Sequence, residues 1–117
     1  MGLVVVTFQI PLTEDREIGR RTRHPPFRWK ALQDALHDQF GGRTEIGKWP
    51  GNWRSSGSHK ATRDTSRAFQ VDVPEERLEE VRALLRRASK TFVQRAIRVI
   101  IKGEAEYLEG GPDDPPL

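Results

Sequence analysis

The fold of this chain is decided by residues 66–101, which read SRAFQVDVPEERLEEVRALLRRASKTFVQRAIRVII. Apolar and polar side chains alternate over residues 69–73, the period of two that is typical of a strand with one buried face. Pro74 then opens a helix, and apolar residues at three- and four-residue steps give residues 78–92 one apolar stripe. Alternation returns over residues 97–101. The segment therefore predicts a strand, a helix that covers a sheet, and a second strand.

The N-terminal half of the chain predicts a similar succession of elements. Residues 3–10 have high β propensity and end at a proline, and the charged segment 13–24 is expected to be a loop. Two prolines then open a helix over residues 27–40, and two glycines stop it. A shorter strand is expected over residues 43–49. The Gly-, Ser- and Trp-containing stretch 50–65 is interpreted as a long hairpin connection.

The order strand, helix, strand, strand, helix, strand predicts an α+β fold. We expect a ferredoxin-like βαββαβ sandwich, in which a four-stranded antiparallel sheet carries both helices on one face. The first strand should neighbour the strand that begins at Ser66, the strand 43–49 should lie at an edge, and Phe8, Phe69 and Ile97 should face the helices. The last strand is expected to run on or bulge at Gly103.

Length and composition restrict the class of protein. At 117 residues, with 35% hydrophobic and 32% charged residues, the chain has room for one domain and is not disordered by composition. We expect a single domain over residues 1–108 and a flexible tail over 109–117. The chain has no cysteine, and its first apolar run is too short to cross a membrane, so we expect a cytoplasmic protein without a membrane partner.

Residues 47–63, GKWPGNWRSSGSHKATR, are the first candidate for a binding site. We expect Trp49, Trp53 and Arg54 to contact a protein partner, as two planar anchors and a directional cation. The first alternative is a nucleic-acid site, because aromatic rings and cations together bind single strands. Its residues would be Arg20, Arg21, Arg23, Lys48, Arg54, His59, Lys60 and Arg63. The second alternative is that the tryptophans fold back on the sheet edge and the cations are merely solvated.

The sheet face turned away from the helices is the second candidate. It is predicted to expose Val5 and Ile100 near the centre of the sheet, beside Thr7 and Arg98. Such a face either stays wet or binds something, often a second copy of the same chain. We favour pairing, so these four residues are the predicted interface of a homodimer or of a complex with another protein.

The histidines give a third, minor hypothesis. His24, His37 and His59 lack the spacing of a metal site, so we expect no metal and no cofactor. A small hydrolase or isomerase would use His59, or His24 near Glu17, as its base.

The chain resembles a set of small uncharacterised bacterial proteins over residues 27–102. The residues that carry the resemblance are Phe40, Gly41, Gly42, Trp53, Arg54, Phe69–Val73 and Arg95–Ile101. The resemblance implies a ferredoxin-like fold and no assigned activity, and the arginine-rich segment before the first helix departs from the pattern. The leading hypothesis is therefore a non-enzymatic interaction module that self-associates through its sheet and presents the Trp/Arg hairpin to a partner.

Overall fold

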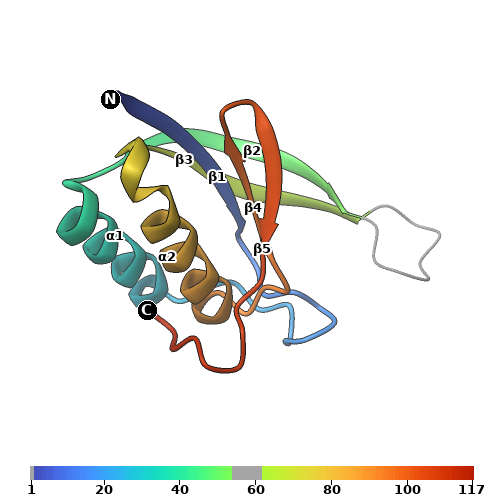
Figure 1. Ribbon diagram of the computed structural model, residues 1–117. Coiled ribbons are helices and arrows are strands. Elements are labelled where there is room, and N and C mark those ends of the chain that lie inside the picture. The colour runs from blue at the N-terminus through green and yellow to red at the C-terminus, as the bar shows by residue number, and fades with distance from the viewer. Residues whose placement is uncertain (1, 54–61) are drawn as a thin grey trace.

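The computed structural model describes the backbone of residues 2–53 and 62–117. It also describes the side chains of these residues, except those of residues 50–53 and 62–64. These residues form two α-helices and five strands (Figure 1). The elements are β1 Leu3–Pro11, α1 Pro26–Phe40, β2 Thr44–Trp53, β3 Thr62–Pro74, a 3-10 turn Glu75–Arg77, α2 Leu78–Thr91, β4 Ile97–Ile101 and β5 Glu104–Leu108. The predicted α+β class is confirmed. Neither described helix combines the length and the apolar character needed to cross a membrane.

All five strands form one antiparallel sheet in the order β2-β3-β1-β4-β5. The predicted number of four strands is wrong, because the chain reverses at Lys102 and Gly103 and neither runs on nor bulges there. Both residues have positive φ angles, 52° and 80°, which suit a two-residue turn between antiparallel strands. Ile101 consequently pairs with Glu104, and β5 forms one edge of the sheet while β2 forms the other.

The hairpin of β2 and β3 is longer than the sequence indicated. The sequence predicted a connection over residues 50–65, but the two strands stay paired as far as Trp53 and Thr62. Residues 50–53 and 64 include proline, glycine, asparagine and aspartate, which have low β propensity, so the local sequence did not indicate this pairing. Once β2 and β3 are paired, the same register carries the hydrogen-bonded ladder on through these residues.

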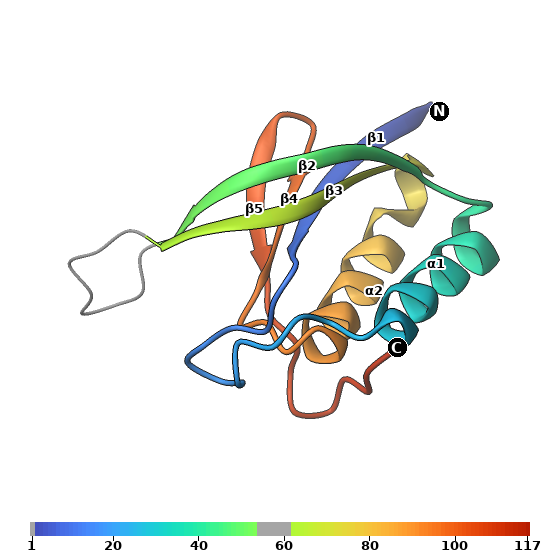
Figure 2. The same cartoon turned by 180° about the vertical axis from the view of Figure 1, so that it is seen from behind.

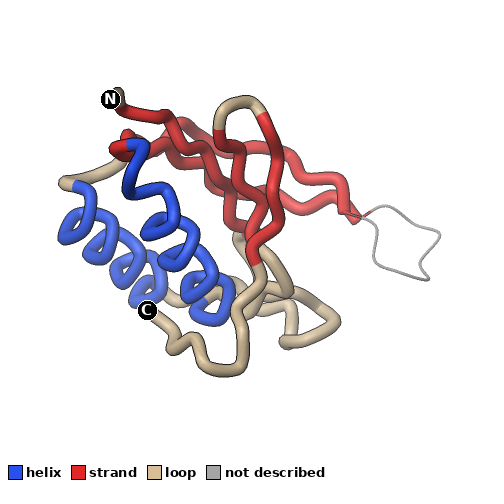
Figure 3. The backbone as a smooth tube through the Cα atoms, in the orientation of Figure 1, coloured by secondary structure: helices blue, strands red, loops and turns tan. Residues whose placement is uncertain are grey.

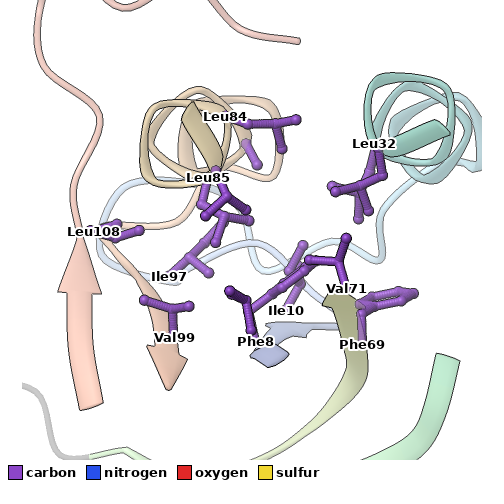
Figure 4. Packing of buried hydrophobic residues seen from close by; sticks show 14 of the residues in the cluster. Phe8, Ile10, Leu32, Phe69, Val71, Leu84, Leu85, Ile97, Val99 and Leu108 are labelled. Atoms are coloured by element: carbon purple, nitrogen blue, oxygen red, sulfur yellow. The ribbon is translucent and has the colours of Figure 1, made fainter. Parts of the chain in front are cut away.

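Both helices cover one face of the sheet, and the core lies between the two layers (Figure 2). Phe8, Phe69 and Ile97 are fully buried in this layer, with Leu32 of α1 and Leu85 of α2 (Figure 4). The rings of Phe8 and Phe69 stack with centroids 5.4 Å apart. The expectation that the three strand residues face the helices is therefore confirmed.

Two arginines tie the helices to the sheet. The guanidinium of Arg67 on β3 donates to both carboxylate oxygens of Glu45 on β2, at 2.8 and 2.7 Å, and lies 4.3 Å from the ring centroid of Trp29 on α1. Arg82 on α2 donates to both carboxylate oxygens of Glu106 on β5, at 3.1 and 3.0 Å. A guanidinium that bonds both oxygens of one carboxylate fixes the relative orientation of the two groups as well as their distance. They hold each edge strand to the helical layer.

The segment after β5, which the sequence suggested would be a loose tail, passes around the C-terminal end of α2 (Figure 3). The backbone N–H of Gly110 donates to Ser89 Oγ at 2.9 Å. The N–H of Leu117 donates to Thr91 Oγ1 at 2.7 Å, and the Leu117 side chain packs against the core. Residues 109–117 thus form a strap over the C-terminal turns of α2.

Candidate functional site

The candidate site is the sheet face that points away from the helices, called the open sheet face below. Along β1, Val5 and Thr7 alternate with buried residues and therefore lie on this face. Thr7 pairs with Ile100 on β4, and Arg98 lies two residues before Ile100 on the same strand. The four residues predicted from the sequence are thus brought together on two neighbouring strands. Val5 is 52% exposed, so a large apolar side chain meets solvent near the middle of the sheet.

Two further apolar side chains on this face were missed in the sequence. Tyr107 on β5 pairs with Arg98 and is 57% exposed. Leu3, two residues before Val5 on β1, is 65% exposed. Tyr107 could not be placed because the final strand was expected to run on from β4 instead of folding back beside it. The signal that could have found it is the Lys102-Gly103 pair between two alternating runs.

Trp49 lies on the same face at the opposite edge. It pairs with Ser66, and because Ser66 alternates with the helix-facing Arg67, both point away from the helices. Trp49 is half-buried within β2 and does not stand in a loop. The other predicted partner contacts, Trp53 and Arg54, fall outside the side chains that the structure describes.

Half of the predicted nucleic-acid residues can be placed. Arg20, Arg21 and Arg23 are exposed on the loop that follows β1, and Lys48 is exposed on the edge strand β2. Hydrogen bonds and a bridge between Thr13 and Arg23 close this loop at its base. No ion pair among the described residues uses any of these four cations. The remaining residues, Arg54, His59, Lys60 and Arg63, lie outside the described side chains.

His24 is buried at the base of the same loop. Its Nδ1 lies 3.0 Å from a guanidinium nitrogen of Arg28, which can only donate, so Nδ1 accepts and the proton resides on Nε2. Nε2 then donates to the carbonyl of Pro11 at 2.9 Å. Burial, and secondly the charge of Arg28, lower the pKa of His24 to about 4. Both ring nitrogens are thus occupied by protein groups, which leaves none for a substrate.

The carboxylates around this loop have structural partners. Glu14 accepts from the backbone N–H of Arg20 at 3.0 Å and from the Arg28 guanidinium at 2.9 Å, and these bonds, in this order of importance, lower the pKa of Glu14. Glu17 pairs with Arg95 at 2.6 Å, so the acid-base pair of His24 and Glu17 considered from the sequence is not formed. Sequence neighbours often point apart, and here each carboxylate pairs with a cation on a different segment of the chain. Within the described residues, no three His, Asp or Glu side chains gather in a way that could hold a metal ion.

Neither the protein-family models nor the sequences of curated proteins include a match. Among solved structures, the chain is similar to a phage SAM lyase in complex with S-methyl-5′-thioadenosine, with a TM-score of 0.65 and 14% sequence identity. The likeness covers 92% of this chain and 90% of that one. At this identity it shows a shared fold.

Proposed function

We propose that this protein is a non-enzymatic interaction module that self-associates through its open sheet face. The observation that carries the proposal is the exposure of three large apolar side chains on that one face. Leu3 is 65% exposed, Val5 52% and Tyr107 57%. Ile100 lies between Val5 and Tyr107 in the register, which makes the patch continuous across β1, β4 and β5.

The physical reason is the free energy of apolar surface. Burial of apolar surface contributes roughly 25 cal/mol per Å², so a second apolar face laid over this patch would stabilise the complex. Single apolar side chains are common on any protein surface, but a continuous group that runs from the central strand to one edge of an uncovered sheet face is typical of an interface. We include in the proposal that Trp49 contacts a further protein partner from the β2 side of the same sheet, and that Trp53 and Arg54, which lie outside the described side chains, belong to the same contact.

The fold name belongs to the same proposal. We take β1 to β4 with the two helices to be a ferredoxin-like βαββαβ unit, extended by β5. The order β2-β3-β1-β4 and its antiparallel pairing support this assignment. In such a unit the helix-free face is the one available for association.

The test is the oligomeric state of matched variants, measured by analytical ultracentrifugation over a range of concentrations. The wild type should form a dimer, and the double variant Val5→Ser/Tyr107→Ser should dissociate at least about tenfold more readily, since each truncation removes about 1 kcal/mol or more of buried apolar surface. Phe27→Ser is the control, because Phe27 is 67% exposed but lies on α1. A wild type that stays monomeric at the highest concentration would overturn the proposal.

A second candidate function is the binding of nucleic acid through the arginine-rich loop. The observation that favours it is the exposure of Arg20, Arg21 and Arg23, none of which has an ion-pair partner among the described side chains. Their replacement by glutamine should weaken binding to a single-stranded oligonucleotide and flatten its salt dependence, whereas Lys90→Gln on α2 should not. Binding that does not weaken as salt rises would exclude this candidate.

The structural neighbour supplies an assay that could contradict the non-enzymatic part of the proposal. That protein is a phage SAM lyase whose structure holds S-methyl-5′-thioadenosine. Purified protein should leave SAM intact and should not bind S-methyl-5′-thioadenosine in calorimetry. Formation of S-methyl-5′-thioadenosine from SAM faster than in a protein-free blank would show that the protein is an enzyme and would contradict the non-enzymatic part of the proposal.

A further inference from the structure

We infer that the occupant of the open sheet face is a second copy of this chain, related to the first by a two-fold axis that passes Thr7 and pairs Asp72 of each copy with Arg98 of the other. The inference rests on the proposed self-association and adds its geometry. It also identifies the charged residues that select the partner.

The starting observation is the charge on the open sheet face. Of the strand residues whose side chains are described, only Asp72 and Arg98 place a charge on this face. Neither forms an ion pair with another described side chain. Asp72 is exposed and Arg98 is half-exposed. The described part of this face therefore carries one acid and one base and has no net charge, so it suits a copy of itself better than a polyanion.

The two charges lie symmetrically about Thr7. Asp72 stands on β3 opposite Val5, which is two residues before Thr7, and Arg98 stands on β4 opposite Gln9, which is two residues after it. Since β3 and β4 flank β1, each charge is one strand and two residues away from Thr7, in opposite directions. Strand spacing of about 4.8 Å and a rise of about 3.4 Å per residue put each Cα about 8 Å from that of Thr7.

This placement determines one axis. The axis lies in the interface, passes Thr7 and runs perpendicular to the line from Asp72 to Arg98. A half-turn about this axis exchanges the two charged positions. Each acid then faces the base of the other copy, and this contact occurs twice, as two-fold symmetry requires. The strands of the two sheets would cross at roughly 70°, near the orthogonal class of sheet packing.

The same rotation also pairs the apolar side chains, although they played no part in placing the axis. On the flat strand lattice it puts Val5 of one copy about 3 Å, measured in the plane, from the position of Ile100 in the other. It puts Leu3 about 4 Å from the position of Tyr107. All the exposed apolar residues of the patch thereby find apolar partners, and two charges find opposite charges. The open sheet face is self-complementary in this one orientation.

Charge reversal tests the pairing. Asp72→Arg alone and Arg98→Asp alone should each raise the dimer dissociation constant by about tenfold or more, because like charges then meet twice. The double variant Asp72→Arg/Arg98→Asp should recover most of the wild-type affinity. Asp38→Arg on α1 is the control for an acid reversed off the interface, and circular dichroism verifies folding. A wild-type dimer whose affinity is unchanged by the single reversals would overturn the inference and leave the proposed self-association standing.

A cross-link tests the axis independently. The chain has no cysteine, so Thr7→Cys introduces a single thiol that should lie next to its own copy. A short bismaleimide should convert this variant to a covalent dimer. Asp34→Cys, exposed on α1, should stay monomeric under the same conditions. Equal cross-linking of the two variants would contradict the axis, whereas a wild type that is monomeric in ultracentrifugation would refute the proposed function itself.

Discussion

The protonation of His24 should control the stability of this protein in mild acid. Its Nδ1 accepts from Arg28 and its Nε2 donates to the Pro11 carbonyl, so only the neutral ring fits. A proton added to Nδ1 would face the Arg28 guanidinium within a buried site. Burial and this cation lower the pKa of His24 from 6.5 to about 4 in the folded protein.

The direction of the effect follows from proton linkage. Between pH 6.5 and about pH 4, His24 is protonated in the unfolded chain but stays neutral in the folded protein. The free energy of unfolding therefore falls as the pH drops through this range. Above pH 7 the ring is neutral in both states and contributes no pH dependence. The loss should reach about 2 kcal/mol at pH 5 relative to pH 7.5. Glu14, whose pKa is lowered from 4.5, adds its own loss only at more acid pH.

The assay is urea unfolding of the wild type and of His24→Gln at pH 7.5, 6.5, 5.5 and 5.0. Glutamine can still donate to the Pro11 carbonyl but takes up no proton, so its unfolding free energy should change by about 2 kcal/mol less than that of the wild type over this range. An NMR titration of the His24 ring gives the pKa directly. Parallel stability profiles for the two proteins, or a measured His24 pKa near 6.5, would refute the buried neutral assignment.

Three further changes test the packing described above. Phe8→Ala removes a fully buried ring and should cost about 3–5 kcal/mol of unfolding free energy, read from the urea midpoint. Arg67→Lys keeps the charge but loses the two-point carboxylate bond and the stacking on Trp29, so thermal unfolding should show a loss of about 1 kcal/mol. Gly110→Ala places a Cβ 2.7 Å from a backbone carbonyl of α2 and should lower the free energy of unfolding by about 1–3 kcal/mol. Gly111→Ala is the control and should lower it less, because the nearest neighbour of its Cβ is a side-chain oxygen at 3.3 Å. Equal effects of the two substitutions would show that the strap is not packed against α2.

The candidate site was only partly accessible to sequence reasoning. The alternation along β1 and β4 placed Val5, Thr7, Arg98 and Ile100 on the helix-free face, because a period of two is a local property. Tyr107 was missed, since its place on that face depends on a reversal at Lys102 and Gly103 that the local pattern allowed but did not require. Trp49 was placed at the end of a strand, but its position on the open sheet face was not predicted, because that position depends on the pairing with β3 and on the register shift between Glu45 and Gly47.

The sequence by itself determined the two helices, the strands with alternating apolar residues and the side of the sheet on which the core forms. These features follow from periodicity and from prolines and glycines that act within a few residues. The tertiary structure alone decided the fifth strand, the extent of the β2–β3 hairpin and the partners of each charge. Glu14 and Glu17 illustrate the reason, because their partners Arg28 and Arg95 lie 14 and 78 residues further along the chain and only folding brings them within hydrogen-bond distance. His24 likewise donates to the carbonyl of Pro11, which lies 13 residues before it.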